Sequence, residues 1–502
     1  MTTLKISDGL VKDDILVVGL SHKSGKGGLL IESGDLALDT KALVASLNDL
    51  GATGKEDEVI KVPGTTTRLI VFTGLGKHSA HYSDETLRRA AGAAVRALAG
   101  NSSTTIALPT KTVSAVSAIA EGAGLGNYLF ADFRGSTKAS QKSPLKSITI
   151  HTSLVKGAEA KAIAEEASVI SQYTTLVRDL INTPPSHLTP ITFTKKIEAA
   201  VKAAGGASAG LKITILNETQ LKSKGFGGII GVGQGSANPP RLLQVSYSPK
   251  GASKKDLKKL AFVGKGITFD TGGLALKPAQ GMEAMKSDMS GAAAICAATI
   301  ALAALKAPVA IEAYAPLAEN MVSDNATRPS DVITMYGGKT VEVLNPDAEG
   351  RLILADALVK AQENNDIDGI IDVATLTGAQ LIALGKRTSA VMTNNDGFRD
   401  RFMATTHHTG EQFWPMPLPQ ELRASLDSPV ADLANIGERM GGMLVAGLFL
   451  KDFVSDSLPW LHLDIAGPAF NEGSAHGYTP VGGTGVAMRS LVRFAISESE
   501  LS

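Results

Sequence analysis

Acidic residues in the second half of the chain stand where an α/β fold delivers side chains to a ligand. Asp270 follows the strand-like run LAFVGKGITF, and Asp288 precedes the apolar, helix-like run SGAAAICAATIALAAL. Asp347 and Glu349 lie between the strand-like TVEVL and the helix-like GRLILADALVKAQ. Strand-to-helix junctions of such folds meet at the carboxyl edge of the sheet, so we expect the four carboxylates to lie together. Asp288 is also suited to cap its helix.

Four carboxylates in one place repel each other and lose hydration unless cations neutralise them. Divalent metal ions are the simplest such cations. Each residue taken alone is more often a helix cap or a solvated turn, so the prediction depends on the whole set. Oxygen-rich sites with one amine tolerate several ions, which leaves Mn, Zn and Mg open.

Basic residues accompany the acidic ones at short spacing. Lys265 precedes Asp270 in a glycine-flanked turn, and Lys277 follows it. Lys265 can act as a neutral nitrogen ligand among cations, whereas a protonated Lys277 can stabilise a developing oxyanion. A salt bridge to a carboxylate is the alternative for either lysine. Arg351, at the predicted helix start after Glu349, can hold a planar oxyanion in bidentate fashion.

These segments occur in an order that is typical of one family. They are VGKGITFDTGG, Lys277-Pro278, the run from Met285 to Met289, NPDAEGRL and ATLTGA. Together these segments closely resemble the leucyl (cytosol) aminopeptidase family. The resemblance runs from about Arg178 to the C-terminus and is loose in the N-terminal part.

The resemblance implies two divalent metal ions per subunit, Mn or Zn, with Mg also compatible. One ion is expected at Lys265, Asp270, Asp288 and Glu349. The other is expected at Asp270, Asp347 and Glu349. Asp270 and Glu349 would then bridge the pair.

The resemblance also implies two catalytic positions that bind no metal. These are Lys277, which also contacts the substrate, and Arg351, which holds a bicarbonate. The implied activity is hydrolysis of the N-terminal residue from short peptides with a free N-terminus, by a water that the two ions activate. Peptide turnover by a homohexamer is the setting that the family suggests.

The same resemblance places further residues at the substrate. Met285, Thr375, Gly378 and Ala379 are expected to line the pocket for the first side chain, and the backbone at Leu376 to lie near the reacting group. A methionine among small residues suits Leu- or Met-like side chains. For Met285 alone, core packing is an equally good interpretation.

One position departs from the family pattern. Pro346 replaces the threonine that the family usually has between Asn345 and Asp347. Proline deletes a backbone donor and stiffens the turn. We expect the metal site to persist, with its metal affinity or pH optimum slightly altered.

The periodicity of the chain predicts two α/β domains joined by a helix. We expect a small, non-catalytic N-terminal domain over residues 1–156, with a role in assembly or regulation, and a linker helix over 157–185. A catalytic domain with a mixed, largely parallel central sheet is expected over 186–502. Its strands are expected at LKITIL, RLLQVSY, KLAFVGKG, VAIEAYAPL, TVEVL, GIIDVATL and WLHLDIAG.

Composition excludes several classes of protein. Lysine plus arginine and aspartate plus glutamate both total 49, so nucleic-acid binding is not expected as a main function. The lysine-bearing loops before Lys146 leave a DNA-binding patch open, because some members of the family bind DNA. The longest apolar run, from Ala292 to Leu305, is shorter than the ~20 residues that span a bilayer. With a charged N-terminus and a single cysteine, Cys296, expected to be buried, we expect a cytoplasmic protein without a membrane partner.

A metal-dependent phosphoester hydrolase is the main alternative, because it also uses clustered carboxylates. Such enzymes commonly add histidine ligands and basic phosphate clamps. The nine histidines show no HExxH spacing, and we expect His407 and His408 to have surface or structural roles.

Two glycine-rich segments resemble nucleotide-binding loops without meeting their requirements. Gly27 stands where a phosphate loop starting at Gly19 would need Ser or Thr. The second segment, GFGGIIGVGQGS from Gly225, lacks the following helix and acidic residue of a dinucleotide site. We expect turn and close-packing glycines there.

Overall fold

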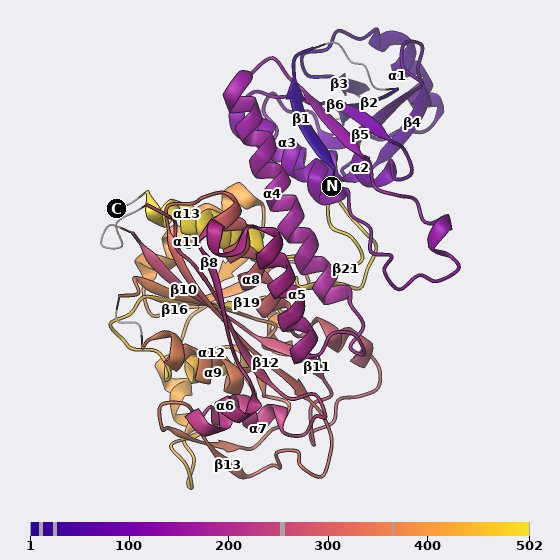
Figure 1. The fold of residues 1–502 in the computed structure, drawn as a ribbon. Coiled ribbons are helices and arrows are strands. Elements are labelled where there is room, and N and C mark those ends of the chain that lie inside the picture. The colour runs from indigo at the N-terminus through magenta and orange to yellow at the C-terminus, as the bar shows by residue number, and fades with distance from the viewer. Residues whose placement is uncertain (1, 10–13, 24–27, 252–256, 364–365, 501–502) are drawn as a thin grey trace. The chain divides into compact units, whose positions relative to one another are not determined.

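The computed structural model describes residues 2–9, 14–23, 28–251, 257–363 and 366–500. It divides into two compact units (Figure 1). Unit 1 comprises residues 1–175 and 471–481, and unit 2 comprises residues 176–470 and 482–502. Helix α4 (Gly157–Asn182) begins at the start of the predicted linker and contributes residues to both units.

Unit 1 is built on a seven-stranded sheet of order β1-β7-β6-β2-β5-β4, with β3 paired to β2. Along β2, Ile15 and Val17 face one apolar cluster while Leu16 and Val18 face another. Because alternate side chains of a strand point to opposite faces, this sheet is covered on both sides. The elements of unit 1 are β1 (Thr3–Ser7), β2 (Ile15–His22), β3 (Leu29–Glu32), α1 (Thr40–Asp49), β4 (Val59–Pro63), β5 (Leu69–Lys77), α2 (Asp84–Ala97), β6 (Ser103–Ala107), α3 (Val113–Gly126), η1 (Lys138–Ser140) and β7 (Ser147–His151).

Residues 471–481 belong to unit 1, although the sequence assigned them to the catalytic domain. The backbone N–H of Gly477 donates to Asp57, and the hydroxyl of Tyr478 donates to Glu85 at 3.0 Å. These hydrogen bonds connect a late segment of the chain to the turn before β4 and to α2. Nothing in the sequence indicated that residues 471–481 would join unit 1.

Unit 2 is built on a nine-stranded sheet of order β17-β16-β19-β15-β10-β12-β9-β8, with β11 paired to β12. The central strands β12, β10, β15 and β19 are parallel, whereas β8, β9 and β16 pair antiparallel. The predicted mixed, largely parallel sheet is confirmed. Its strands are β8 (Leu211–Leu216), β9 (Arg241–Tyr247), β10 (Lys259–Gly264), β11 (Gly266–Asp270), β12 (Ala310–Asn320), β15 (Gly369–Ala374), β16 (Ser389–Thr393), β17 (Phe413–Pro415) and β19 (Trp460–Asp464).

Helices pack around this sheet. The start of α5 shows why the chain turns helical there: Thr189 caps it, Thr192 closes a reciprocal capping box, and Pro190 fixes the first turn. The helices of unit 2 are α5 (Pro190–Ala203), η2 (Gly206–Ala209), α6 (Glu218–Lys224), α7 (Gly227–Gly233), η3 (Met282–Ser287), α8 (Ser290–Ala304), α9 (Gly350–Ala361), α10 (Gly378–Leu384), α11 (Asp396–Thr409), η4 (Gln420–Leu426), α12 (Gly442–Lys451) and α13 (Met488–Ser499).

Helix α8 is the core helix of unit 2. Residues 282–304 are long and apolar enough to cross a membrane by length and composition, but 94% of their most apolar window is buried. A helix that is apolar on all sides is typical of such a core position. Cys296 lies inside it, buried as predicted, and burial raises the pKa of its thiol.

The predicted strand TVEVL lies outside the large sheet, which corrects the expectation. It forms β14 (Thr340–Val343), which pairs antiparallel with β13 (Asp331–Thr334) and parallel with β18 (Leu433–Ala434). The residues after β14 are therefore positioned by a separate three-stranded sheet. A further short pair is formed by β20 (Phe470–Asn471) and β21 (Gly482–Gly483).

The glycine-rich segment from Gly225 contains α7, a short helix that the sequence did not predict. A side chain at Gly227 or Gly228 would meet the backbone of Thr334 or Leu352, so these glycines allow close packing, as expected. Residues 24–27 of the other glycine-rich segment lie outside the described residues.

Candidate metal and active site

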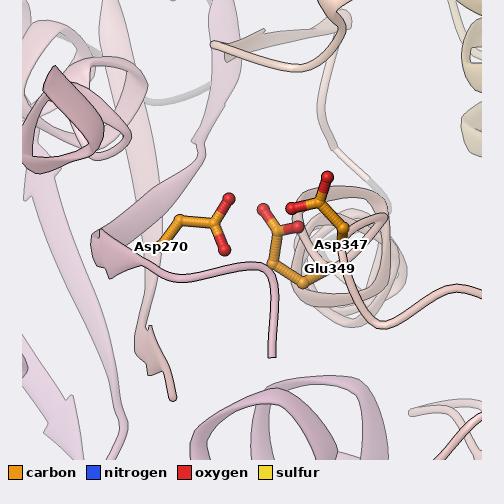
Figure 2. A group of neighbouring side chains, drawn as sticks. All are labelled: Asp270, Asp347 and Glu349. Carbon is orange, nitrogen blue, oxygen red and sulfur yellow. The ribbon is translucent and has the colours of Figure 1, made fainter. Parts of the chain in front are cut away.

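Three acidic residues from two segments of unit 2 lie close together. Asp270 ends β11, while Asp347 and Glu349 lie in the loop between β14 and α9. Carboxylate oxygens of all three lie within 4.8 Å of one another. Figure 2 shows their carboxylates turned toward one another. The sheet edge and the loop after β14 thus supply the acidic group together.

Lys265 connects this group to the fourth acidic residue. Its Nζ lies 2.9 Å from Oδ1 of Asp288 and 2.8 Å from Oε1 of Glu349. It also donates to the carbonyl of Thr375 at 2.8 Å. Burial alone would lower the pKa of Lys265, but the charges of Asp288 and Glu349 outweigh it and raise this pKa. These two carboxylate contacts favour the ammonium form of Lys265.

Lys277 occupies the other side of the acidic group. Its Nζ lies 2.8 Å from Oδ2 of Asp270 and also contacts Asp347. Burial favours the neutral amine, but the nearby carboxylates, Asp270 first, raise the pKa of Lys277. Its side chain is 22% exposed, so this cation borders solvent, unlike Lys265.

Asp288 does not cap α8, contrary to one sequence expectation. The residue before the helix is Met289, and no side chain caps the first turn. The Oδ1 atom of Asp288 instead accepts a hydrogen bond from the Thr375 hydroxyl at 2.7 Å. Lys265 and the Thr375 hydroxyl thus hold the Asp288 carboxylate through its Oδ1 atom.

The donor set fits divalent cations. Four carboxylates face two ammonium groups, which leaves two excess negative charges. Burial, opposed by Lys265, raises the pKa of Asp288 well above its usual range, and burial also raises the pKa of Glu349. The Oδ2 atom of Asp288 is buried and has no hydrogen-bond partner among the described residues. An oxygen that lacks a partner in a negatively charged pocket suits a metal ion.

Arg351 lies in the first turn of α9, as predicted, and is buried. Its Nη1 donates to the carbonyl of Asn435 at 2.8 Å, and its guanidinium lies 5.9 Å from the Phe449 ring centre. Burial lowers the pKa of Arg351 to about 10, so the group stays charged at neutral pH. Its Nε has no hydrogen-bond partner within the described parts of the chain, which suits an anion.

The sequence models of one family match both halves of the chain. The catalytic domain of the cytosol aminopeptidase family matches residues 175–492, and its N-terminal domain matches residues 17–137. The chain belongs to the cytosol aminopeptidase family. The family likeness therefore extends into the N-terminal part, where the sequence motifs gave only a loose resemblance. The chain is a metal-dependent aminopeptidase that hydrolyses peptides from the N-terminus.

Individual relatives of this aminopeptidase cover nearly its full length. A probable cytosol aminopeptidase of Streptomyces griseus subsp. griseus is 49% identical over 519 residues, which cover 99% of this chain and 98% of the relative. That of Streptomyces coelicolor is 47% identical over 520 residues, with the same coverage of both chains.

Solved structures show the same architecture. A mutant of tomato leucine aminopeptidase matches with a TM-score of 0.86 and 29% identity, covering 99% of this chain and 97% of its own. The bottromycin maturation enzyme BotP in complex with Mn matches with a TM-score of 0.84 and 34% identity, covering 97% and 99%.

The predicted substrate residues of this aminopeptidase lie on two segments. Met285 is half-buried in η3, and Thr375 and Leu376 follow β15. Gly378 is exposed at the start of α10, and the adjacent Ala379 packs against the apolar cluster that contains Met392 and Met443. Thr375 contacts both Lys265 and Asp288, so it borders the acidic group as well as the predicted pocket.

Three supporting residues of this aminopeptidase were not predicted. Asn320 donates to Oδ1 of Asp270 at 2.8 Å and to the carbonyl of Pro346 at 3.1 Å. Asp464 accepts from the backbone of Leu376 at 3.1 Å, and Asn435 holds the loop after β14. Asn320 and Asp464 end predicted or nearly predicted strands, which was a usable signal. Asn435 follows the two-residue strand β18, for which the sequence gave none.

Proposed function

We propose that this aminopeptidase uses two divalent ions held by the predicted ligands. Lys265, Asp270, Asp288 and Glu349 would hold one ion, and Asp270, Asp347 and Glu349 the other. The main support for this proposal is that carboxylates from β11 and from the loop after β14 lie close together. Mn or Zn, with Mg also compatible, suits this oxygen-rich set.

The chain's own residues supply the remaining chemistry. Ions held by these residues would supply Lewis-acid chemistry, which binds the free α-amine of the substrate and activates a water. Lys277, charged and near solvent, would donate to the oxyanion that forms at the first peptide carbonyl. Arg351 would hold a bicarbonate that carries a proton toward the leaving amine. The unpartnered Nε of Arg351 supports this anion site.

The substrate would be a short peptide with a free N-terminus and a Leu- or Met-like first residue. The half-buried Met285, and Ala379 packed beside a methionine-containing cluster, support this preference. We further propose that the protein works in cytoplasmic peptide turnover as a homohexamer, in which unit 1 has no catalytic role.

Metal analysis with a peptide-cleavage assay tests the function directly. Wild type is expected to bind two Mn ions per chain and to hydrolyse a leucine anilide. Glu349→Ala is expected to lose at least one ion and nearly all activity, because Glu349 would bridge both. If Glu349→Ala kept both metals and full activity, the proposal would be wrong. An aryl phosphate in the same assay separates the alternative, since a phosphoester hydrolase would prefer it.

A further inference from the structure

Asn435 is a buried polar residue that the mechanism above does not use. It follows β18 directly and is fully inaccessible to solvent. Its backbone N–H donates to the carbonyl of Glu342 at 2.9 Å, which continues the pairing of β18 with β14. The side chain therefore starts from a fixed backbone, beside the loop that carries Asp347 and Glu349.

The carboxamide of Asn435 makes hydrogen bonds near both ends of that loop. Its Oδ1 accepts from the backbone of Leu344 at 2.8 Å and of Asn345 at 3.1 Å. Its Nδ2 donates to the carbonyl of Asn345 at 2.7 Å and of Ala348 at 3.4 Å. Two acceptor sites and two donors exhaust what a carboxamide offers. The loop conformation is thus matched to this one amide group.

The backbone of the same residue fixes the catalytic arginine. The carbonyl of Asn435 accepts from Nη1 of Arg351 at 2.8 Å. One residue therefore holds both the loop with the acidic ligands and the guanidinium after it.

We propose that Asn435 is a positioning residue for hydrolysis, which rests on the function proposed above. It holds Asp347 and Glu349 at the metal-binding geometry and Arg351 at the reacting group. A carboxamide is required, because aspartate has no donors and would face the carbonyls of Asn345 and Ala348 with a negative charge.

The test compares Asn435→Ala and the nearly isosteric Asn435→Asp with a control, Asn394→Ala. The side chain of Asn394 also makes two hydrogen bonds to backbone atoms in unit 2. It donates to the carbonyl of Leu458 and accepts from the N–H of Trp460, both at 2.9 Å. Each variant is measured for Mn affinity of the metal-free protein, for kcat and KM on a leucine anilide at saturating Mn, and for Tm.

We expect the two Asn435 variants to lose metal affinity or activity and the Asn394 control to keep both. Both Asn435 variants should lose about 10–100-fold in Mn affinity or kcat, the usual effect of removing a residue that orients metal ligands. KM should change less than kcat, because the side-chain pocket is untouched. Asn394→Ala should lower Tm while leaving kcat and Mn affinity at wild-type values.

Two outcomes would overturn the inference. One is an Asn435→Ala or Asn435→Asp protein with wild-type Mn affinity and kcat, whatever its Tm. The other is an equal loss of kcat in Asn394→Ala, which would show a general effect of destabilisation. Glu349→Ala distinguishes the two proposals: if it loses metal while the Asn435 variants keep wild-type Mn affinity and kcat, only the role of Asn435 is wrong.

Discussion

The Nζ atom of Lys265 lies 2.8 Å from Oε1 of Glu349, with both side chains almost completely buried. An ammonium ion here neutralises a carboxylate that water cannot reach. A metal ligand at the same place must be a neutral amine, so metal binding has to remove a proton from Lys265. Lys265 should therefore release a proton on metal binding if it is a ligand, but not if it is only a salt-bridge partner.

Lys265→Met is expected to lower Mn affinity, because it removes the proposed nitrogen ligand while leaving a side chain of similar length. It should also reduce the number of protons released on metal binding. Calorimetric titration in buffers of different ionisation enthalpy measures both quantities. Equal affinity and equal proton release in wild type and variant would show that Lys265 is a salt-bridge partner only.

Lys277→Met is expected to give the opposite pattern. It removes a cation that faces Asp270 and Asp347, so Mn affinity should stay the same or rise. Because the oxyanion loses a donor, kcat should fall by about 100–1,000-fold. Steady-state kinetics at saturating Mn, with the same calorimetric titration, check both. A variant with weakened metal binding and unchanged kcat would contradict this role.

The elements that the sequence predicted well are those whose signal is local. Asp270 sits at the end of a long apolar strand run, and its place at the sheet edge follows from strand direction alone. The role of Asp288 was harder, because a helix cap and a ligand occupy the same position in the sequence. Its contact with Thr375 joins residues far apart in the chain. The folded structure excludes the role of helix cap, and the role of ligand stays a prediction.

The strand ends at Asn320 and Asp464 were a usable signal, but the hydrogen bonds of the supporting residues could not be predicted. Asn320 and Asn435 act through hydrogen bonds to backbone atoms, which any sequence could offer. The strand TVEVL was predicted in the wrong sheet for another reason. The periodicity of a sequence shows which side chains of a strand are buried, but it does not show which strand it pairs with. Its partner β18 has only two residues, too few to show any alternation.

Pro346→Thr tests the one departure from the family motif. Pro346 is buried, and its carbonyl accepts from Nδ2 of Asn320, which also holds Asp270. Threonine would keep that carbonyl but restore a backbone donor and loosen the turn. We expect a small shift in Mn affinity or pH optimum, with activity retained. Titrating Mn into both metal-free proteins and recording pH profiles checks this, and indistinguishable results would refute it.

The buried carboxyl group of Asp356 should make the free energy of unfolding depend on pH, independently of metal. It is fully buried in α9 and accepts from the backbone N–H groups of Ile229 and Tyr336, each at 2.8 Å. Burial raises the pKa of Asp356 to about 7, from the usual value of 3.8, although these hydrogen bonds oppose the rise. Between these values the folded protein holds a proton that the unfolded chain has released.

The free energy of unfolding should therefore fall as pH rises from about 4 to about 7, by up to about 4 kcal/mol from this group. Asp356→Asn should abolish that share of the slope. The variant should also be less stable at pH 4 by about 1–3 kcal/mol, since its amide N–H₂ must face a backbone N–H. Urea unfolding of the metal-free proteins across this range measures both effects. Parallel pH curves for wild type and variant would mean that Asp356 is already ionised at low pH, held by its backbone donors.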